Sequence, residues 1–258
     1  MSCSDNSLYS DASMIPNSRK SRVSSAKHVS VENRLLAALP RKARQIFLSG
    51  CEQVELVFGN ILCEPGETIR HVYFPTDSFI SLMTSIEGHS SLEVSLVGSE
   101  GMCGIPLMLG VNVSSLLAVV RGAGTAWRMD AGRFHSELKH NVALQRHLNR
   151  YLYVLIRELA QTAACTRFHV VEERLARWLL MTRDRAHSKE FHITHELLAQ
   201  ALGVRRVGVT KAAGSLQKKK LISYSRGDVK IHDTGGLEAA SCGCYRADKE
   251  TYDRILHC

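Results

Sequence analysis

The chain has 258 residues, which is enough for one large domain or for two ordinary domains that bury their own cores without disulfides. Hydrophobic residues make up 45% of it and charged residues 22%, so the composition excludes a fibrous or wholly disordered protein. No apolar run reaches the ~18 residues of a membrane span, and no signal peptide is evident at the N-terminus. We therefore expect two domains in the cytoplasm, with the cysteines reduced.

The positive charge is concentrated in one segment. The whole chain has a formal net charge of +8, and residues 167–232 contain fourteen Lys or Arg against six Asp or Glu, an excess of the same size. A basic balance of this size favours an anionic partner such as DNA, RNA or a membrane surface. We expect that partner to contact the C-terminal third of the chain.

Residues 1–30 are rich in serine, poor in aromatic and branched apolar residues, and include the basic run Arg19-Lys20-Ser21-Arg22. Such a segment cannot bury enough apolar surface to order itself. We interpret it as a disordered tail, in preference to a DNA-contacting arm or a transit peptide.

Residues 31–140 begin with two short helical stretches, at 33–39 and 40–48, and continue with short alternating apolar segments separated by glycines. Strands of about five residues at regular turn spacing are typical of an antiparallel barrel or roll. The predicted strands cover residues 54–58, 72–74, 79–83, 92–97 and 116–120.

Leucines at alternating steps of four and three mark a long helix over residues 142–166. This is the spacing of a coiled-coil seam, and it predicts a dimer interface formed by Leu148, Leu152, Leu155 and Leu159. The same stripe would also suit packing against the barrel of its own chain, and the pattern alone does not separate the two. A second amphipathic stretch, over residues 170–183, indicates an ordinary core helix.

Residues 193–217 have the features of a helix-turn-helix. Thr194 is placed to cap a short helix, Glu196 complements its positive end, and Gly203 supplies the positive φ that ends it. Ala199 is small where two helices must cross, and Val209 can fill the angle between them. We predict a second helix over residues 205–219.

The second helix presents cations on its outer face. Residues 202–220 contain six basic residues and no acidic one, which suits the phosphates of a duplex. An arginine near the start of such a helix can contact guanine O6 and N7 bidentately. The alternating residues on either side of Arg226-Gly227-Asp228 predict a two-stranded wing. The predicted DNA contacts are Arg205, Arg206, Val207, Thr210, Lys211, Lys218 and Arg226.

With both halves in view, residues 33–245 resemble the Crp/Fnr superfamily of bacterial transcription factors. The resemblance rests on Pro65-Gly66-Glu67, Tyr73-Phe74-Pro75, the glycine-rich run 98–104 and the helix-turn-helix. It implies a cyclic-nucleotide-binding-like β-roll, a central dimerisation helix and a winged DNA-binding domain, and it favours the dimer over packing within the chain.

The resemblance also implies roles for three residues of the second helix. Arg206 matches the family's guanine-reading arginine, and Lys211 falls where a second basic residue contacts DNA. Val207 stands where the best-known members have a glutamate that reads a cytosine, so we expect a different base pair at that position, with an apolar contact from Val207, for example to a thymine methyl.

The effector-binding residues of cAMP-responsive relatives are not matched. Their Gly-Glu pair for ribose aligns with Gly104-Ile105, and their Arg-Ser pair for the cyclic phosphate aligns with Val113-Ser114. Because both the carboxylate and the guanidinium are missing, we expect no cAMP binding of the usual kind. The tail has only Cys3, so an iron–sulfur cluster of the oxygen-sensing type is not expected. Cys242-Gly-Cys244 has a one-residue gap and no matching pair, so no metal site is predicted.

Together these features predict an α+β protein with a tail at 1–30, a β-roll at 31–140, a dimerisation helix at 141–166, a winged helix-turn-helix at 167–236 and an extension at 237–258. The predicted function is a homodimeric transcription regulator that contacts a palindromic double-stranded DNA site and RNA polymerase, with an unknown effector or none, no cofactor and no membrane contact. An alternative is a small-ligand sensor that acts mainly through protein contacts. No catalytic residues are predicted, because no P-loop, Rossmann, nucleophile-elbow or zinc motif occurs.

Overall fold

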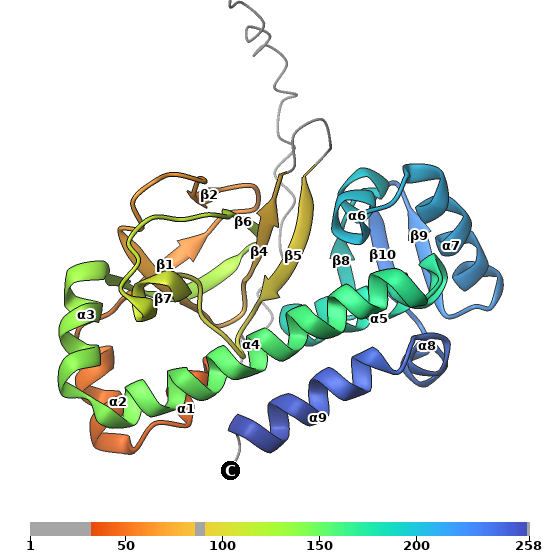
Figure 1. Ribbon diagram of the computed structural model, residues 1–258. Coiled ribbons are helices and arrows are strands. Elements are labelled where there is room, and N and C mark those ends of the chain that lie inside the picture. The colour runs from red at the N-terminus through yellow and green to blue at the C-terminus, as the bar shows by residue number, and fades with distance from the viewer. Residues whose placement is uncertain (1–31, 86–90, 257–258) are drawn as a thin grey trace, which may run out of the picture.

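The structure is a computed structural model that describes residues 32–85 and 91–256; the predicted tail at 1–30 lies outside these ranges. Figure 1 shows a β-roll at one end of the molecule, a helical domain with a small sheet of its own at the other, and the long helix α4 beneath them. This is the predicted α+β fold class. No helix within the described ranges has both the length and the hydropathy to cross a membrane.

The roll consists of two antiparallel sheets, with strand orders β1-β7-β3 and β2-β6-β4-β5. Because side chains alternate along a strand, every second one points between the sheets, where Leu56, Tyr73, Ile80, Val97 and Val120 form a core. The strands are β1 (Glu52–Leu56), β2 (Ile61–Cys63), β3 (His71–Pro75), β4 (Phe79–Thr84), β5 (Leu92–Val97), β6 (Leu117–Gly122) and β7 (Gly124–Asp130).

Short helices close the end of the roll next to α4. Asn33 caps the first of them by accepting from Leu36 N, and its buried side-chain amide donates to Pro75 O and Gly101 O, both at 2.9 Å. Phe47 meets Phe74 edge to face at 5.3 Å between ring centroids. The helices are α1 (Arg34–Ala37), α2 (Arg41–Leu48), the 3₁₀ helix η1 (Ile105–Leu109) and α3 (Ala131–His140).

Helix α4 (Val142–Phe168) begins where the sequence predicted and ends two residues later. Asn141 caps it through a 3.0 Å hydrogen bond from Leu144 N. Leu148 has no exposed area and packs in the core beneath the roll, so it has no surface to offer a second copy. In the single chain Leu148 therefore packs against its own roll, as in the alternative that the pattern left open.

The C-terminal domain has one core, formed where Leu175, Leu179, Leu198, Val209 and Leu216 meet. Its three strands are ordered β8-β10-β9, with β9 and β10 forming the predicted wing. The elements are α5 (Val171–Ala186), β8 (Glu190–His192), α6 (His195–Leu202), α7 (Arg206–Lys218), β9 (Ile222–Ser225) and β10 (Asp228–Ile231).

The segment predicted only as an extension forms two helices, α8 (Thr234–Ala240) and α9 (Cys244–Leu256). Figure 1 shows α9 lying alongside α4. Tyr245, Tyr252 and Leu256 are buried, and the Tyr252 hydroxyl donates to Glu100 O at 2.7 Å. Residues 234–256 are therefore part of the folded body.

Candidate nucleic-acid interface

Helices α6 and α7 meet through the local signals that the sequence carries. Thr194 Oγ1 accepts from Leu197 N at 3.2 Å and so caps α6. Gly203, with φ 61°, ends α6, and Val204 N donates back to Ala199 O. Buried Val209 fills the angle between the two helices. These contacts form a helix-turn-helix.

Helix α7 has one buried side and one open side. Val209, Ala212, Ala213 and Leu216 point into the domain core. The opposite side is open, and Val207, an apolar residue, is 60% exposed there. Of the predicted DNA contacts, all are exposed: Arg205, Arg206, Val207, Thr210, Lys211, Lys218 and Arg226.

The start of α7 is held through Thr210 by His195 and Tyr224, two residues that were not predicted as part of the site. Thr210 Oγ1 lies 3.1 Å from both Arg206 O and His195 Nδ1. The His195 ring stacks on Tyr224 at 4.4 Å between centroids, and the Tyr224 hydroxyl donates to Ile193 O at 2.6 Å. Burial and the nearby Arg206 lower the pKa of His195, so its ring is neutral at neutral pH. The chain Thr210–His195–Tyr224 joins α7, α6 and the wing.

The wing has a tight turn at Arg226-Gly227. Both residues have positive φ, 52° and 93°, and a Cβ on Gly227 would lie 2.5 Å from the His192 ring. The ring in turn lies 2.8 Å from Asp228 Oδ1. This geometry leaves the Arg226 side chain exposed at the tip of the wing.

The winged domain rests on strand β5 of the roll. Trp178 Nε1 donates to Glu93 Oε1 at 2.7 Å, and Glu93 also accepts from Ser81 Oγ at 2.6 Å. Burial raises the pKa of Glu93. At the turn after α6, a Cβ on Gly203 would lie 2.9 Å from Leu92. The helix-turn-helix is thus packed on the roll by its inner side, and the face with Val207 remains open.

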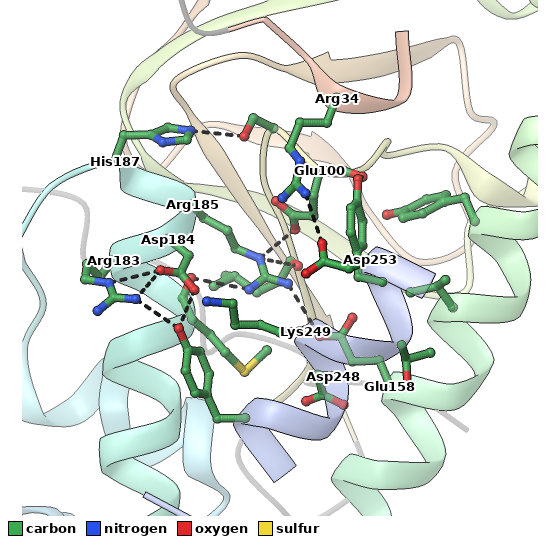
Figure 2. A pocket seen from close by; sticks show the side chains of 18 of the residues that line it. Arg34, Glu100, Glu158, Arg183, Asp184, Arg185, His187, Asp248, Lys249 and Asp253 are labelled. Atoms are coloured by element: carbon green, nitrogen blue, oxygen red, sulfur yellow. Dashed lines mark hydrogen bonds and ion pairs between the residues drawn. The ribbon is translucent and has the colours of Figure 1, made fainter. Parts of the chain in front are cut away.

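A cavity of about 510 Å³ lies where the roll, α4, α5 and α9 meet. Figure 2 shows Arg185 there with the carboxylates of Glu100 and Glu158. Arg185 Nε lies 2.7 Å from Glu100 Oε1, and Arg185 Nη2 lies 3.5 Å from Glu158 Oε1. Burial raises the pKa of Glu158 to about 7, against the opposing effect of Arg185. These buried ion pairs connect the roll, the central helix and the winged domain.

The four leucines predicted as a dimer seam share one stripe of α4 but differ in exposure along the helix. Leu148 is buried, Leu152 and Leu155 are half-buried, and Leu159 is 45% exposed. Leu155 packs against the core of its own chain. Beside them Ile156 is 56% exposed. The exposed aliphatic side chain in the middle of α4 is therefore Ile156, one position after the predicted Leu155.

By the resemblance, Gly104-Ile105 and Val113-Ser114 stand where cAMP-responsive relatives contact the nucleotide. In this structure three of these residues contact other residues of the roll. Gly104, with φ 106°, lies against Val72. Thr68 pairs with Val113, and Ser114 Oγ donates to Leu116 O at 2.7 Å. Neither aligned pair brings a carboxylate or a guanidinium, so the basis for expecting no cAMP is unchanged.

The geometry defines a class of protein: a winged helix-turn-helix joined through a long helix to a β-roll, as in DNA-binding transcription regulators. Residues 173–240 match the Crp-like helix-turn-helix domain. A global nitrogen regulator of Nostoc sp. (strain PCC 7120) is 24% identical over 177 residues, which cover 65% of this chain and 79% of that protein.

Two solved structures show the same fold. A Crp/Fnr family transcriptional regulator from Eubacterium rectale superposes with a TM-score of 0.63 at 16% identity, covering 81% of this chain and 99% of that one. FixK2 from Bradyrhizobium japonicum has a TM-score of 0.64 at 12% identity, covering 74% and 98%. Residues 173–240 therefore form a Crp-like helix-turn-helix domain, and the chain has the fold of the Crp/Fnr transcription regulators to which it is similar.

Proposed function

We propose that this regulator binds a palindromic duplex as a homodimer, with one α7 in each of two successive major grooves. The observation that carries the proposal is the exposed face of α7 with Arg206, Val207 and Lys211, at the end of the molecule away from the roll. Two recognition helices on one face of B-form DNA must lie roughly 34 Å apart. A two-fold dimer can satisfy that spacing.

Residues of α7 and the wing divide into base and phosphate contacts in this proposal. Arg206, in the first turn, reads a guanine through O6 and N7, and Lys211 makes a second contact. Val207 offers only an apolar contact, which suits a thymine methyl. The remaining exposed groups lie where they can neutralise or hydrogen-bond phosphates, namely Arg205, Thr210, Lys218 and Arg226.

The dimer interface in this proposal is the open apolar row of α4. Leu152, Ile156 and Leu159 are spaced by four and three residues, which places them on one side of the helix. Ile156 and Leu159 are 56% and 45% exposed in the single chain, so a second copy has apolar area to cover.

We assign residues 31–140 to regulation, 141–166 to dimerisation and 167–236 to DNA binding. The contacts at β5 and at Arg185 hold the winged domain in one placement. An effector would act by favouring this placement or another, and thereby set the spacing of the two recognition helices. In a regulator without an effector, the winged domain would keep a single position relative to the roll.

The proposal is tested by selecting DNA sites from random duplexes and titrating the selected site across salt concentrations. We expect a palindrome with half-sites about 10 base pairs apart. The logarithm of the binding constant should fall linearly with the logarithm of the salt concentration. Recovery of a single half-site with one chain bound would overturn the dimeric arrangement. Absence of any selected sequence would overturn specific recognition.

A further inference from the structure

Four metal-ligating side chains gather where α4 meets the winged domain. Cys165 lies in the last turn of α4 and His169 directly follows the helix, while Cys242 and Cys244 lie at the link between α8 and α9. One potential ligand atom from each lies within 4.8 Å of all the others. We propose that these residues hold a single zinc ion in a closed Cys₃His site.

Two of the six distances between the ligand atoms match the edges of a tetrahedral zinc centre. With zinc bonds of about 2.3 Å to sulfur and about 2.0 Å to nitrogen, a tetrahedron has edges of about 3.8 Å between two sulfurs and about 3.5 Å between sulfur and nitrogen. Cys165 Sγ and Cys242 Sγ are 3.6 Å apart, and Cys244 Sγ is 3.6 Å from His169 Nδ1. The other distances are within 4.8 Å, so an ion at the centre would draw the more distant ligand atoms inward.

The surroundings of the thiols differ from those of ordinary core cysteines. A buried free cysteine usually packs among aliphatic side chains as a small hydrophobe. Here the buried cluster consists of Cys165, Cys242 and Cys244 alone. Gln161 Nε2 donates to Cys244 Sγ at 3.0 Å, an outer hydrogen bond of the kind that orients metal ligands.

The charge at the site suits three thiolates around a dication. Such a centre has a net charge of −1, which burial would penalise without a nearby cation. Arg174 and Arg177 both interact electrostatically with Cys165. Arg177 is buried, and its Nε has no hydrogen-bond partner among the described residues.

The geometry favours a mononuclear ion over the two other uses of clustered cysteines. A disulfide needs sulfurs about 2.0 Å apart and would join only two of the residues, leaving the third thiol and the imidazole unexplained. An iron–sulfur cluster holds its cysteines on different irons and so spreads them farther apart than one ion does. Four ligands that converge on one point, with all three cysteines buried, are typical of structural zinc.

The proposed ion would tie the end of α4 to the start of α9. Figure 1 shows the link between α8 and α9 at the same end of α4. Asp248 of α9 in turn forms a 2.7 Å ion pair with Arg177 of α5. Zinc at this junction would hold the C-terminal helix and the base of the winged domain in a fixed relation.

The test is the metal content of the full-length protein purified without chelators, measured by mass spectrometry of the elements. We expect about one zinc per chain in the wild type and in Cys103→Ser, whose buried cysteine lies in the roll, and at least a tenfold lower content in Cys242→Ser. Equal zinc in Cys103→Ser and Cys242→Ser would overturn the site, as would zinc-free wild type that also fails to bind added zinc.

A second measurement does not depend on a variant that loses the ion. The wild type stripped of metal and loaded with cobalt should show the visible absorption of tetrahedral cobalt with three thiolates, and His169→Cys should keep the metal and shift the bands toward four thiolates. Octahedral cobalt spectra, or a Cys165–Cys242 disulfide in protein isolated without oxygen, would overturn the proposal.

Discussion

At the helix-turn-helix, local chemistry determines where the helices begin and end but not which side chains meet across the domain. Thr194 caps α6 and Gly203 ends it, as the sequence predicted, because capping and positive φ depend only on a residue and its neighbours in the chain. The stacking of His195 on Tyr224 was not predicted. That pair comes from segments far apart in the chain, and no local pattern signals it.

Replacement of Arg206 by alanine should remove discrimination at one base pair in each half-site. The difference in binding free energy between the correct and the wrong base should fall by about 1–3 kcal/mol, because a bidentate contact to guanine is removed. The fold should be unaffected, since Arg206 is exposed at the start of α7. Site selection with the variant measures the change.

Arg41→Ala is the matched control for this substitution. It removes the same charge from an exposed position in α2, at the opposite end of the molecule. An unchanged base preference in Arg206→Ala, or an equal change in both variants, would contradict the assignment of Arg206 to base reading.

At the scale of one element, the periodicity of α4 indicated a seam but not which residues face outward. Leu148 and Leu155 lie toward their own chain, and Ile156 lies in the open row. A helix with apolar residues on two sides supports two heptad readings, and only the position of the roll and α9 selects between them.

Ile156→Glu should dissociate the proposed dimer. Placing a carboxylate in an apolar seam costs about 3 kcal/mol or more, which corresponds to roughly a hundredfold rise in the dissociation constant. Sedimentation velocity across protein concentrations measures it. Val111→Glu, at a 51% exposed position in the roll, is the control and should leave the assembly unchanged. Equal dissociation constants for both variants would place the interface elsewhere.

Glu158 in α4 should make stability depend on pH. Burial raises its pKa from 4.5 to about 7, with Glu100 and Asp248 acting in the same direction and Arg185 and Arg177 against it. Between about pH 4.5 and 7 the folded state keeps a proton that the unfolded state has lost. The free energy of unfolding therefore falls as pH rises through this window, by at most about 3 kcal/mol.

Urea unfolding of Glu158→Gln at several pH values checks this dependence. The amide has no proton to lose, so the slope of stability against pH should flatten across the window. Glu55→Gln, at an exposed position in β1, should keep the wild-type slope. A wild-type slope in Glu158→Gln would show that another group titrates there.

At the scale of the whole molecule, the winged domain is docked to the roll by few polar contacts. Trp178→Phe removes the indole donor to buried Glu93 and should weaken docking by about 1–3 kcal/mol. Hydrogen exchange should become faster in β5 and at the inner side of α5. Trp127→Phe, in β7 of the roll, is the control. Unchanged exchange in Trp178→Phe would mean that the contact does not hold the two domains together.

Several elements could not be predicted from their own residues. Strand β7 mixes polar and apolar residues without clear alternation, and both its neighbours in the sheet, β1 and β3, come from elsewhere in the chain. Its own residues therefore did not signal the strand or its pairing. Helix α9 carries Tyr245, Tyr252 and Leu256 at helical spacing, but few other apolar residues mark it. Its burial depends on α4 being beside it.

The proposed zinc site also could not be predicted from local sequence alone. Cys242-Gly-Cys244 has no second pair of ligands near it in the chain. Cys165 and His169 lie at the end of a helix whose leucine spacing was its only predicted feature. The spacing of three residues between Cys165 and His169 was a usable signal. The two pairs are brought together only by the return of the chain along α4.

The sequence by itself determined the α+β class, the helix-turn-helix and the basic segment, because each depends on side-chain chemistry at short range. Tertiary structure alone decided which side of α4 stays open, how the winged domain rests on β5, and that four ligand atoms converge at the end of α4. These features depend on distances between residues far apart in the chain, and such distances exist only after the chain has packed.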